Sequence, residues 1–406
     1  MKNNIVAHIA LPVLNEYKNL NLFIKNLRKQ SFANWELTVC VNQYDSWWNG
    51  KENKKACIDN SKSIDFLKNL NDNRITVLDR SSKGKGWKDK KGGVGFARKT
   101  AMDYIAAKAN GNDIIVSADA DTIYPENWIA EIVSYFNENI KVSGLSLPYY
   151  HPLPEDEKQA RLILRYEIYM RHYALNMIRI NNPYRFTALG SAMAFPVWAY
   201  KKTGGLTPVQ AGEDFYFLQK LVKSGKIGYT ADTVVFPSAR FSSRVNFGTG
   251  PALIKGASGD WNSYPIYPHH FFDEIAETYQ LFNRLYYRDT PLPVDTFLKK
   301  QFGNAAIWQP LRDNYKDLDN FVKACINKID GLRILQYLRF RLETTKTDSD
   351  EENLKKFIYS FYHKDMPNSI DEILTNLDFE NTPTGKLNLL RNFLFQTEKK
   401  ERTKRR

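Results

Sequence analysis

The sequence contains little cysteine. Its three cysteines, Cys40, Cys57 and Cys325, are odd in number and lie far apart in a chain of 406 residues. A disulfide framework needs paired cysteines, and a structural zinc site needs closely spaced cysteine or histidine ligands. The sequence supports neither, and this cysteine usage is typical of a protein in a reducing compartment.

The sequence also lacks a long hydrophobic run. No apolar stretch approaches the ~20 residues that cross a bilayer as a helix. The N-terminus has no long apolar region followed by a small-residue cleavage site, so a signal peptide is not predicted. Zinc-finger and RNA-binding signatures are missing as well, which argues against a nucleic-acid partner. We therefore expect a cytoplasmic protein and leave open a peripheral contact with the inner face of the membrane.

Positive charge is in excess, with a formal net charge of +13. Part of the excess lies in residues 398–406, where six basic residues accompany two acidic ones. A short segment of this composition is typical of a disordered basic tail. The remaining excess suits a phosphorylated substrate or an anionic membrane surface.

Strand-like apolar runs alternate with helix-period segments in the first part of the chain. Residues 5–11, 37–41 and 114–116 are examples of such runs. The alternation predicts an α/β fold in which helices flank a mainly parallel sheet. After about residue 270 the strand signals fade and helix-period segments dominate. The expected organisation is a catalytic domain over residues 1–268, an α-helical C-terminal region over residues 269–397 and the basic tail 398–406.

Two aspartates follow one of the expected strands. Asp119 and Asp121 are separated only by Ala120. In an extended backbone residues i and i+2 point to the same side, so both carboxylates can face one divalent cation. Mg²⁺ and Mn²⁺ prefer oxygen ligands, and Mg²⁺ sites often combine one or two carboxylates with substrate phosphates. Asp119 and Asp121 are thus candidate ligands of a metal and its phosphorylated donor. The alternative is a polar turn that leads into the next helix.

Polar side chains also follow the first two expected strands. The first strand leads into Pro12, Asn15 and Glu16, and the second into Asn42. Ligands of open α/β sheets collect beyond the carboxyl ends of the strands, so these residues and Asp119 are expected around one crevice. The amides of Asn15 and Asn42 can hydrogen-bond a nucleotide base or ribose there. Alternatively, Asn15 caps a helix and Asn42 satisfies a turn.

A Gly- and Lys-rich stretch over residues 83–98 runs into a helix and includes Gly93 and Arg98. Glycines let backbone amides approach a phosphate, and the start of a helix adds positive potential. The stretch matches neither a Walker loop nor the dinucleotide fingerprint. We interpret it as an anion-binding loop for a donor, with a solvated basic loop as the alternative.

A second acidic pair, Glu213 and Asp214, opens a later helix. Acidic residues at a helix start are ordinarily caps that complement the helix dipole. Alternatively, Asp214 acts as general base toward an acceptor hydroxyl, and Glu213 orients the acceptor or the loop.

A basic cluster over residues 240–244 follows this pair. Its guanidinium groups can cover a diphosphate, and Arg244 is the donor-binding candidate. Beyond the cluster, His269 and His270 are each a candidate for a third metal ligand, and we select His270. The alternative is a pair of exposed linker histidines.

The order of these features resembles a family 2 glycosyltransferase of the GT-A fold. The resemblance rests on residues 12–16, the Gly-rich segment that ends at Arg98, residues 119–121, 190–191 and 212–214, and it covers roughly the first two thirds of the chain. It implies transfer of a sugar from a UDP- or GDP-linked donor to a hydroxyl on a glycan, a lipid-linked sugar or a small molecule. Mn²⁺ or Mg²⁺ is the implied cofactor, Asp119 and Asp121 resemble its ligands and those of the ribose-diphosphate, and Asp214 resembles the base of inverting members.

The sequence departs from the family pattern in two places. Asn42 and Gln43 stand where many members have acidic residues, which leaves the nucleotide base open. No Gln-x-x-Arg-Trp motif is present, which favours a non-processive enzyme.

Two other classes of function remain open. A sugar-phosphate nucleotidyltransferase uses a similar sheet and metal, but it is expected to carry a Gly-rich activating loop directly after the first strand, where residues 12–16 read Pro-Val-Leu-Asn-Glu. The second class is a noncatalytic basic adaptor whose helical end binds a membrane or another protein.

Overall fold

The computed structural model describes residues 5–88, 91–209, 212–230, 232–241, 248–304 and 306–405. The chain divides into two compact units. The first comprises Met1–Ile163, Phe186–Asp260 and Arg402–Arg406, and the second comprises Leu164–Arg185 and Trp261–Glu401.

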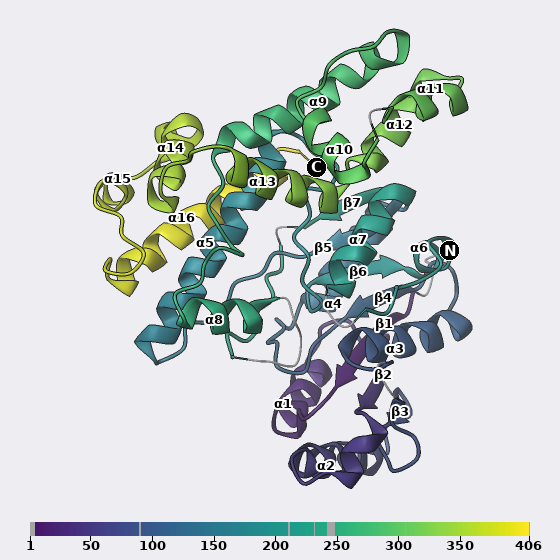
Figure 1. The fold of residues 1–406 in the computed structure, drawn as a ribbon. Coiled ribbons are helices and arrows are strands. Elements are labelled where there is room, and N and C mark those ends of the chain that lie inside the picture. The colour runs from purple at the N-terminus through teal and green to yellow at the C-terminus, as the bar shows by residue number, and fades with distance from the viewer. Residues whose placement is uncertain are drawn as a thin grey trace. The chain divides into compact units, whose positions relative to one another are not determined.

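Within the described residues, the first unit contains a seven-stranded sheet in the order β3-β2-β1-β4-β6-β5-β7 (Figure 1). β6 runs antiparallel to its neighbours β4 and β5, and the other neighbouring pairs are parallel. The strands are Ala7–Val13 (β1), Trp35–Asn42 (β2), Ile75–Arg80 (β3), Ile114–Ser117 (β4), Val142–Ser146 (β5), Met193–Pro196 (β6) and Lys226–Tyr229 (β7).

The central strands are buried on both faces. Every residue of β1 is buried, and so is every residue of β4. This explains why these strands read as continuous apolar runs instead of alternating ones. Helix α3 (Val94–Lys108) packs against β1, β2 and β4, and α7 (Glu213–Ser224) packs against β5 and β7. The predicted α/β class, a mainly parallel sheet flanked by helices and followed by an α-helical C-terminal region, is confirmed.

The helices of the first unit bury one apolar face each. In α1, Leu20, Phe23, Ile24 and Leu27 are buried at the i, i+3, i+4, i+7 spacing of an amphipathic helix. The helices are Tyr17–Arg28 (α1), Lys54–Asn69 (α2), Val94–Lys108 (α3), Trp128–Glu138 (α4), Val197–Lys202 (α6), Glu213–Ser224 (α7) and Thr249–Ala257 (α8), with a 3-10 turn at Asp45–Asn49 (η1).

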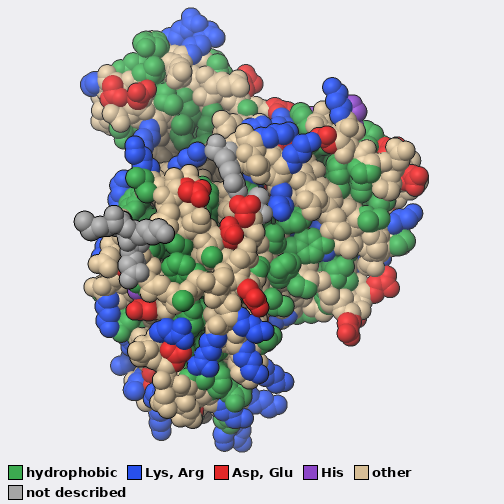
Figure 2. All heavy atoms as spheres, turned by 180° about the vertical axis from the view of Figure 1, so that it is seen from behind, with side chains coloured by type: hydrophobic (Ala, Val, Ile, Leu, Met, Phe, Trp, Pro, Cys, Tyr) green, Lys and Arg blue, Asp and Glu red, His purple; other side chains and the backbone are tan. Residues whose placement is uncertain are grey.

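Much of the positive charge lies at the surface. On the face that Figure 2 shows, Lys and Arg side chains are spread over the surface with acidic side chains among them. They are densest at the lower end, where Figure 1 labels α2 and β3. Lys51, Lys54 and Lys55 near the start of α2 are exposed, as are Lys83 and Lys85 after β3. Exposed lysines of this kind attract anionic partners without fixing their identity.

The second unit is α-helical over its described residues. Leu164, Ile168 and Leu175 of α5 form a buried core with residues of α14, α15 and α16. No helix among the described residues combines the length and the apolar character that crossing a bilayer requires. The helices are Glu157–Arg179 (α5, of which the part from Leu164 belongs here), His269–Tyr287 (α9), Asp295–Phe302 (α10), Gln309–Asn314 (α11), Leu318–Lys328 (α12), Gly331–Thr344 (α13), Asp350–Tyr362 (α14), Asn368–Thr375 (α15) and Thr384–Thr403 (α16, of which the part up to Glu401 belongs here), with a 3-10 turn at His363–Asp365 (η2).

Two features of the second unit differ from the expectations. Most of α5 belongs to its core, although the catalytic domain was expected to include all residues up to 268. The expected disordered tail is also corrected, because α16 continues through residue 398 to Thr403. The physical reason is burial: Glu398 is 3% exposed and accepts a 2.9 Å hydrogen bond from the buried Arg171. A charge that is buried with its partner fixes the segment that carries it.

Candidate active site

Asp119 and Asp121 lie in a turn directly after β4. The strand already ends at Ser117, so the i and i+2 rule for extended backbone does not apply to the pair. The backbone N–H of Thr122 donates to the Asp119 carbonyl at 3.2 Å and closes the turn. Both side chains nevertheless line the same cavities and are 33% and 19% exposed, respectively. A turn, instead of a strand, brings the two carboxylates to one side.

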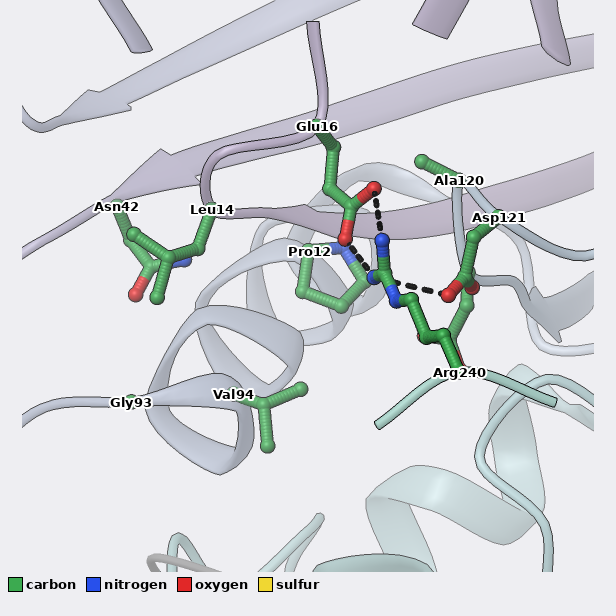
Figure 3. Close-up of a pocket in the computed structure, with 10 residues that line it drawn as sticks. Pro12, Leu14, Glu16, Asn42, Gly93, Val94, Ala120, Asp121 and Arg240 are labelled. Atoms are coloured by element: carbon green, nitrogen blue, oxygen red, sulfur yellow. Dashed lines mark hydrogen bonds and ion pairs between the residues drawn. The ribbon is translucent and has the colours of Figure 1, made fainter. Parts of the chain in front are cut away.

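The segments that follow β1, β2 and β4 line one cavity, which we call the strand-end cavity (Figure 3). These parallel strands are neighbours, with β1 in the middle, so their carboxyl ends meet at one edge of the sheet. The structure therefore brings together most of the predicted donor-binding residues. The cavity is lined by Pro12, Leu14, Glu16, Asn42, Gly93, Val94, Asp119, Ala120, Asp121 and Arg240.

Asn15 is placed differently from its neighbours. It is exposed, has a left-handed backbone conformation (φ 55°), and its backbone N–H donates to Asn60 Oδ1 at 2.8 Å. It is not one of the residues that line the strand-end cavity. Nor does it cap the following helix, because Glu16 holds the N-cap position of α1. Donor binding by Asn15 stays a prediction.

Asn42 lines the cavity, but protein groups already engage its amide. Its Nδ2 donates to the Val13 carbonyl at 2.9 Å, and its Oδ1 accepts from Trp87 Nε1 at 3.1 Å. Only a second Nδ2 hydrogen and the second lone pair of Oδ1 are left for other partners. The amide thus ties β2 to β1 and to the Gly-rich loop, whether or not it also contacts a base.

Glycine is required where the Gly-rich loop enters α3. Gly93 precedes the helix with φ 101°, a conformation that other residues rarely adopt. Gly95 lies so close to the chain that a Cβ at this position would be 2.2 Å from the Val209 carbonyl oxygen. Asp89 and Lys90 of the same loop lie outside the described residues. The loop therefore brings backbone to the cavity edge, as an anion-binding segment must.

Arg98 is the centre of a buried polar network. Its side chain is 2% exposed and forms ion pairs with Asp119 at 2.8 Å and with Glu213 at 3.1 Å. It also donates to Ser117 Oγ at 2.6 Å and to the Gly190 carbonyl at 3.1 Å. The guanidinium has its hydrogens directed at protein acceptors, so its structural role is to fix the two acidic segments relative to each other.

Glu213 and Asp214 form the first turn of α7, after Gly212 in a left-handed conformation (φ 78°). Glu213 is buried, and Asp214 is half-buried with its Oδ1 accepting the Phe215 backbone N–H at 2.7 Å. Both line a second cavity, the acid-pair cavity, together with Asp119 and Asp121. Its other lining residues are Val94, Arg98, Thr122, Leu189, Gly190, Ser191, Gly212, Pro237, Ser238, Arg240, Gly248, Thr249 and Gly250.

Burial shifts the ionisation of this cluster. Burial raises the pKa of Glu213, and the charge of Asp214 raises it further against the opposing effect of Arg98. Burial also raises the pKa of Asp214, although the Phe215 backbone N–H opposes the shift. Burial by itself would lower the pKa of Arg98, but Asp119 and Glu213 outweigh it, and the net shift is upward. A carboxylate with a raised pKa is better suited to accept a proton from a hydroxyl.

Arg240 joins two acidic segments of the strand-end cavity. Its Nη2 lies 2.8 Å from Asp121 Oδ2, and its Nη1 donates to Glu16 Oε2 at 3.1 Å (Figure 3). Nη2 also contacts Glu16 Oε1. Arg240 was predicted only as part of a cluster that covers a diphosphate. No sequence signal indicates its pairing with Glu16, because 224 residues separate the two.

The oxygen ligands present fit a hard divalent cation. Mg²⁺ commonly takes one or two carboxylates and completes its shell with substrate phosphates and water. The position of the Arg240 guanidinium against Asp121 indicates that this carboxylate attracts a counter-cation. Within the described ranges no group of three or more His, Cys, Asp or Glu side chains is arranged to hold a metal.

Two predicted site residues do not belong to the described part of the first unit. Arg244 lies outside the described residues. His270 is an exposed residue at the start of α9 in the second unit, where its ring contacts those of His269 and Phe271. Its role as a third metal ligand stays a prediction.

Sequence reasoning also missed Tyr124. The Tyr124 hydroxyl accepts the Asp119 backbone N–H at 3.0 Å and donates to the Ser191 carbonyl at 3.3 Å. The ring stacks on Trp128 with 3.9 Å between ring centroids and is 6% exposed. Tyr124 thus holds the aspartate turn to the segment that leads into β6. A tyrosine in the turn before an apolar helix was the only available signal.

Comparison with known proteins gave no match to a protein-family model and none to a curated protein sequence. Solved structures are similar at low identity. TarS 1-349 from S. aureus in complex with UDP-GlcNAc has 13% identity and a TM-score of 0.41, over 80% of this chain and 91% of that one. The mannosyltransferase PcManGT from Pyrobaculum calidifontis with GDP-Man and Mn²⁺ has 13% identity and a TM-score of 0.38, over 97% and 86%. GalNAc-T7 with UDP, GalNAc and Mn²⁺ has 14% identity and a TM-score of 0.40, over 80% and 57%.

Proposed function

We propose that the first unit is a metal-dependent glycosyltransferase that moves a sugar from a nucleotide-diphosphate donor to a hydroxyl acceptor. One observation carries the proposal: the aspartate pair after β4 and the acid pair of α7 line the same cavity, and the buried Arg98 connects them. Sugar transfer needs a site for the departing diphosphate beside a base for the acceptor hydroxyl. The two acidic pairs are suited to these two tasks.

The donor end is assigned to the strand-end cavity. Asp119 and Asp121 would hold Mn²⁺ or Mg²⁺, which when bound supplies positive charge for the diphosphate as it leaves. Pro12 and Val94 shape the cavity wall, and the backbone at Gly93 is open to an anion because this residue has no side chain. We assign the contact with the nucleoside, uridine or guanosine, to the residues at the ends of β1 and β2.

The acceptor end is assigned to the acid-pair cavity. Asp214 is half-buried, lines the cavity and has a raised pKa caused first by burial. These are the properties of a general base that takes the proton of a hydroxyl. Glu213 is buried against Arg98 and acts as a positioning residue. We assign an inverting mechanism because Asp214 resembles the base of inverting family members.

The resemblance of residues 12–16, 119–121 and 212–214 to family 2 glycosyltransferases supports the finer assignment. We assign the chain to a non-processive member of that type, with a GT-A catalytic domain. A glycan, a lipid-linked sugar or a small molecule would supply the acceptor hydroxyl. We also propose that it acts in the cytoplasm, where exposed lysines such as Lys51 and Lys54 suit a peripheral contact with anionic lipid.

A panel of UDP- and GDP-linked sugars tests the proposal. We expect Mn²⁺-dependent release of nucleoside diphosphate from one of them by the full chain. Asp121→Asn should abolish this release, whereas Asp214→Asn should retain binding of the nucleoside diphosphate in titration calorimetry and lose sugar transfer. Turnover of a nucleoside triphosphate with a sugar phosphate would instead identify a nucleotidyltransferase. Absence of nucleotide binding with Mn²⁺ present would support the noncatalytic adaptor.

A further inference from the structure

Arg240 lies against Asp121, one of the two carboxylates of the proposed metal site. Its guanidinium is 2.8 Å from Asp121 and donates to Glu16 at 3.1 Å, and it faces the strand-end cavity (Figure 3). Asp121 also lines the acid-pair cavity, as Arg240 does. A guanidinium and a divalent cation cannot occupy the same side of one carboxylate. Arg240 must therefore move away from Asp121 when a divalent cation binds to that side of the carboxylate.

The two carboxylates need a counter-charge at all times. The side chain of Glu16 is 7% exposed and that of Asp121 is 19% exposed. Unpaired charges at such depth are costly. Burial by itself would lower the pKa of Arg240, but its hydrogen bonds with Glu16 and the charge of Asp121 outweigh this, so the side chain stays a cation. Arg240 thus supplies one positive charge that Glu16 and Asp121 share.

Arg240 is held much less firmly than Arg98. Its side chain is 34% exposed, against 2% for Arg98. The backbone before it is fixed, because Phe236 exchanges two 3.0 Å hydrogen bonds with Ile123 and the Ala239 carbonyl accepts from Gln159. The described contacts of the guanidinium itself are with the two carboxylates. The side chain can therefore turn away from Asp121 without breaking the fold.

We propose that Arg240 is a resident counter-ion that competes with the divalent cation for Asp121 and passes to the donor diphosphate when donor and cation bind together. The inference rests on the proposed function. A diphosphate offers the guanidinium paired oxygens in the geometry it prefers, so Arg240 exchanges one anionic partner for another. The cation then meets Asp121 without competition from Arg240. Metal and nucleotide consequently bind cooperatively, each favouring the other to the same degree.

Manganese binding by the full-length protein tests this, measured by titration calorimetry without nucleotide and with saturating UDP or GDP. Arg240→Gln should bind Mn²⁺ more tightly than the wild type without nucleotide. Loss of a partly exposed ion pair of about 1 kcal/mol corresponds to roughly a fivefold change in affinity. The nucleoside diphosphate should raise Mn²⁺ affinity by a larger factor in the wild type than in Arg240→Gln, because only the wild type has a competitor to remove.

Arg74→Gln is the matched control. Arg74 pairs with Asp72 at 2.9 Å elsewhere on the first unit, so its replacement removes the same charge from a comparable ion pair. Its Mn²⁺ affinity should equal that of the wild type. Should Arg240→Gln fail to fold, Arg240→Lys serves in its place, because a shorter point charge cannot bridge both carboxylates and should raise Mn²⁺ affinity by a smaller factor.

Equal Mn²⁺ affinities of the wild type and Arg240→Gln would refute the competition while leaving sugar transfer intact as a function. Tighter binding by Arg240→Gln and Arg74→Gln alike would also refute it, since net charge would then be the cause. If the wild type releases sugar from its donor in the presence of a chelator, Arg240 is a permanent counter-charge, and both the competition and the metal dependence are wrong.

Discussion

Replacement of Arg98 by methionine should destabilise the first unit in a pH-dependent way. Methionine keeps much of the aliphatic volume and removes the charge, so Glu213, whose side chain is 6% exposed, loses its 3.1 Å partner. Removal of one member of a buried ion pair costs about 3–5 kcal/mol, because the other charge stays buried without compensation. We expect a loss in that range at pH 8.

The loss should be smaller at low pH. Burial and Asp214 already raise the pKa of Glu213, and Arg98 is what opposes them. Without Arg98 the pKa rises further, so the carboxyl takes up a proton as the pH falls and no longer needs a partner. Each unit by which the pKa of the folded state is raised corresponds to about 1.4 kcal/mol. Stability of the variant relative to the wild type is therefore recovered below the raised pKa and lost again as the pH increases through it.

Urea unfolding of wild type and Arg98→Met at pH 8 and pH 5.5 measures this difference. Arg74→Gln is the control, with an expected loss of about 1 kcal/mol because Arg74 itself is partly open to solvent. An Arg98→Met loss below that of the control, or one of equal size at both pH values, would show that the guanidinium does not stabilise the buried acid pair.

Four further outcomes are expected. Gly190→Ala should reduce sugar-transfer activity at least tenfold with little effect on nucleotide binding. A Cβ at this position would lie 2.6 Å from Arg98 Nη2 and displace the guanidinium. The kcat and the calorimetric affinity for the nucleotide measure the two effects. Gly95→Ala should cost about 1–3 kcal/mol of unfolding free energy in urea titrations, because the Val209 backbone blocks its Cβ. Gly111→Ala is the control and should be neutral, because the nearest atom to its added Cβ is 3.9 Å away. The pH–rate profile should show activity that falls on acidification at a pH above the range of an ordinary aspartate, because the pKa of Asp214 is raised and the base must be ionised. Glu398→Ala should lower the unfolding free energy of the second unit by about 3 kcal/mol, because Arg171 is 1% exposed and loses a partner. A lower urea midpoint measures this loss.

The fold class could be predicted because it depends on local patterns. Continuous apolar runs, as in β1, mark strands buried on both faces, and the spacing of Leu20, Phe23, Ile24 and Leu27 marks a helix. Parallel strand order alone predicted that Asn15, Asn42 and Asp119 converge; Asn42 and Asp119 line one cavity, and Asn15 is not among its lining residues. Each of these predictions needs only neighbours in sequence and one general rule on sheets.

Features that depend on partners far away in sequence could not be predicted. Residues 398–403 have the composition of a disordered tail, but they are helical and contact residues far away in sequence. Glu398, for example, accepts a hydrogen bond from the buried Arg171, 227 residues away. Similarly, α5 reads as a helix from its sequence, but nothing in it shows that Leu164 and Ile168 pack with α14 to α16. Local composition indicates whether a segment tends to be ordered or disordered. A buried contact with a residue far away in sequence can override that tendency.

Local sequence also could not distinguish the two arginines of the site. Arg98 and Arg240 both follow glycine- or serine-containing segments, and both were expected near phosphate. The difference arises from what surrounds them: Gly190 has no side chain, which leaves room for the Arg98 guanidinium to reach the Gly190 carbonyl and the acidic groups on either side. Arg240 has no such enclosure and keeps one third of its side chain exposed. A cation enclosed by protein acceptors fixes the geometry of the acidic pairs, whereas one that is partly open to solvent can exchange its carboxylates for a phosphate.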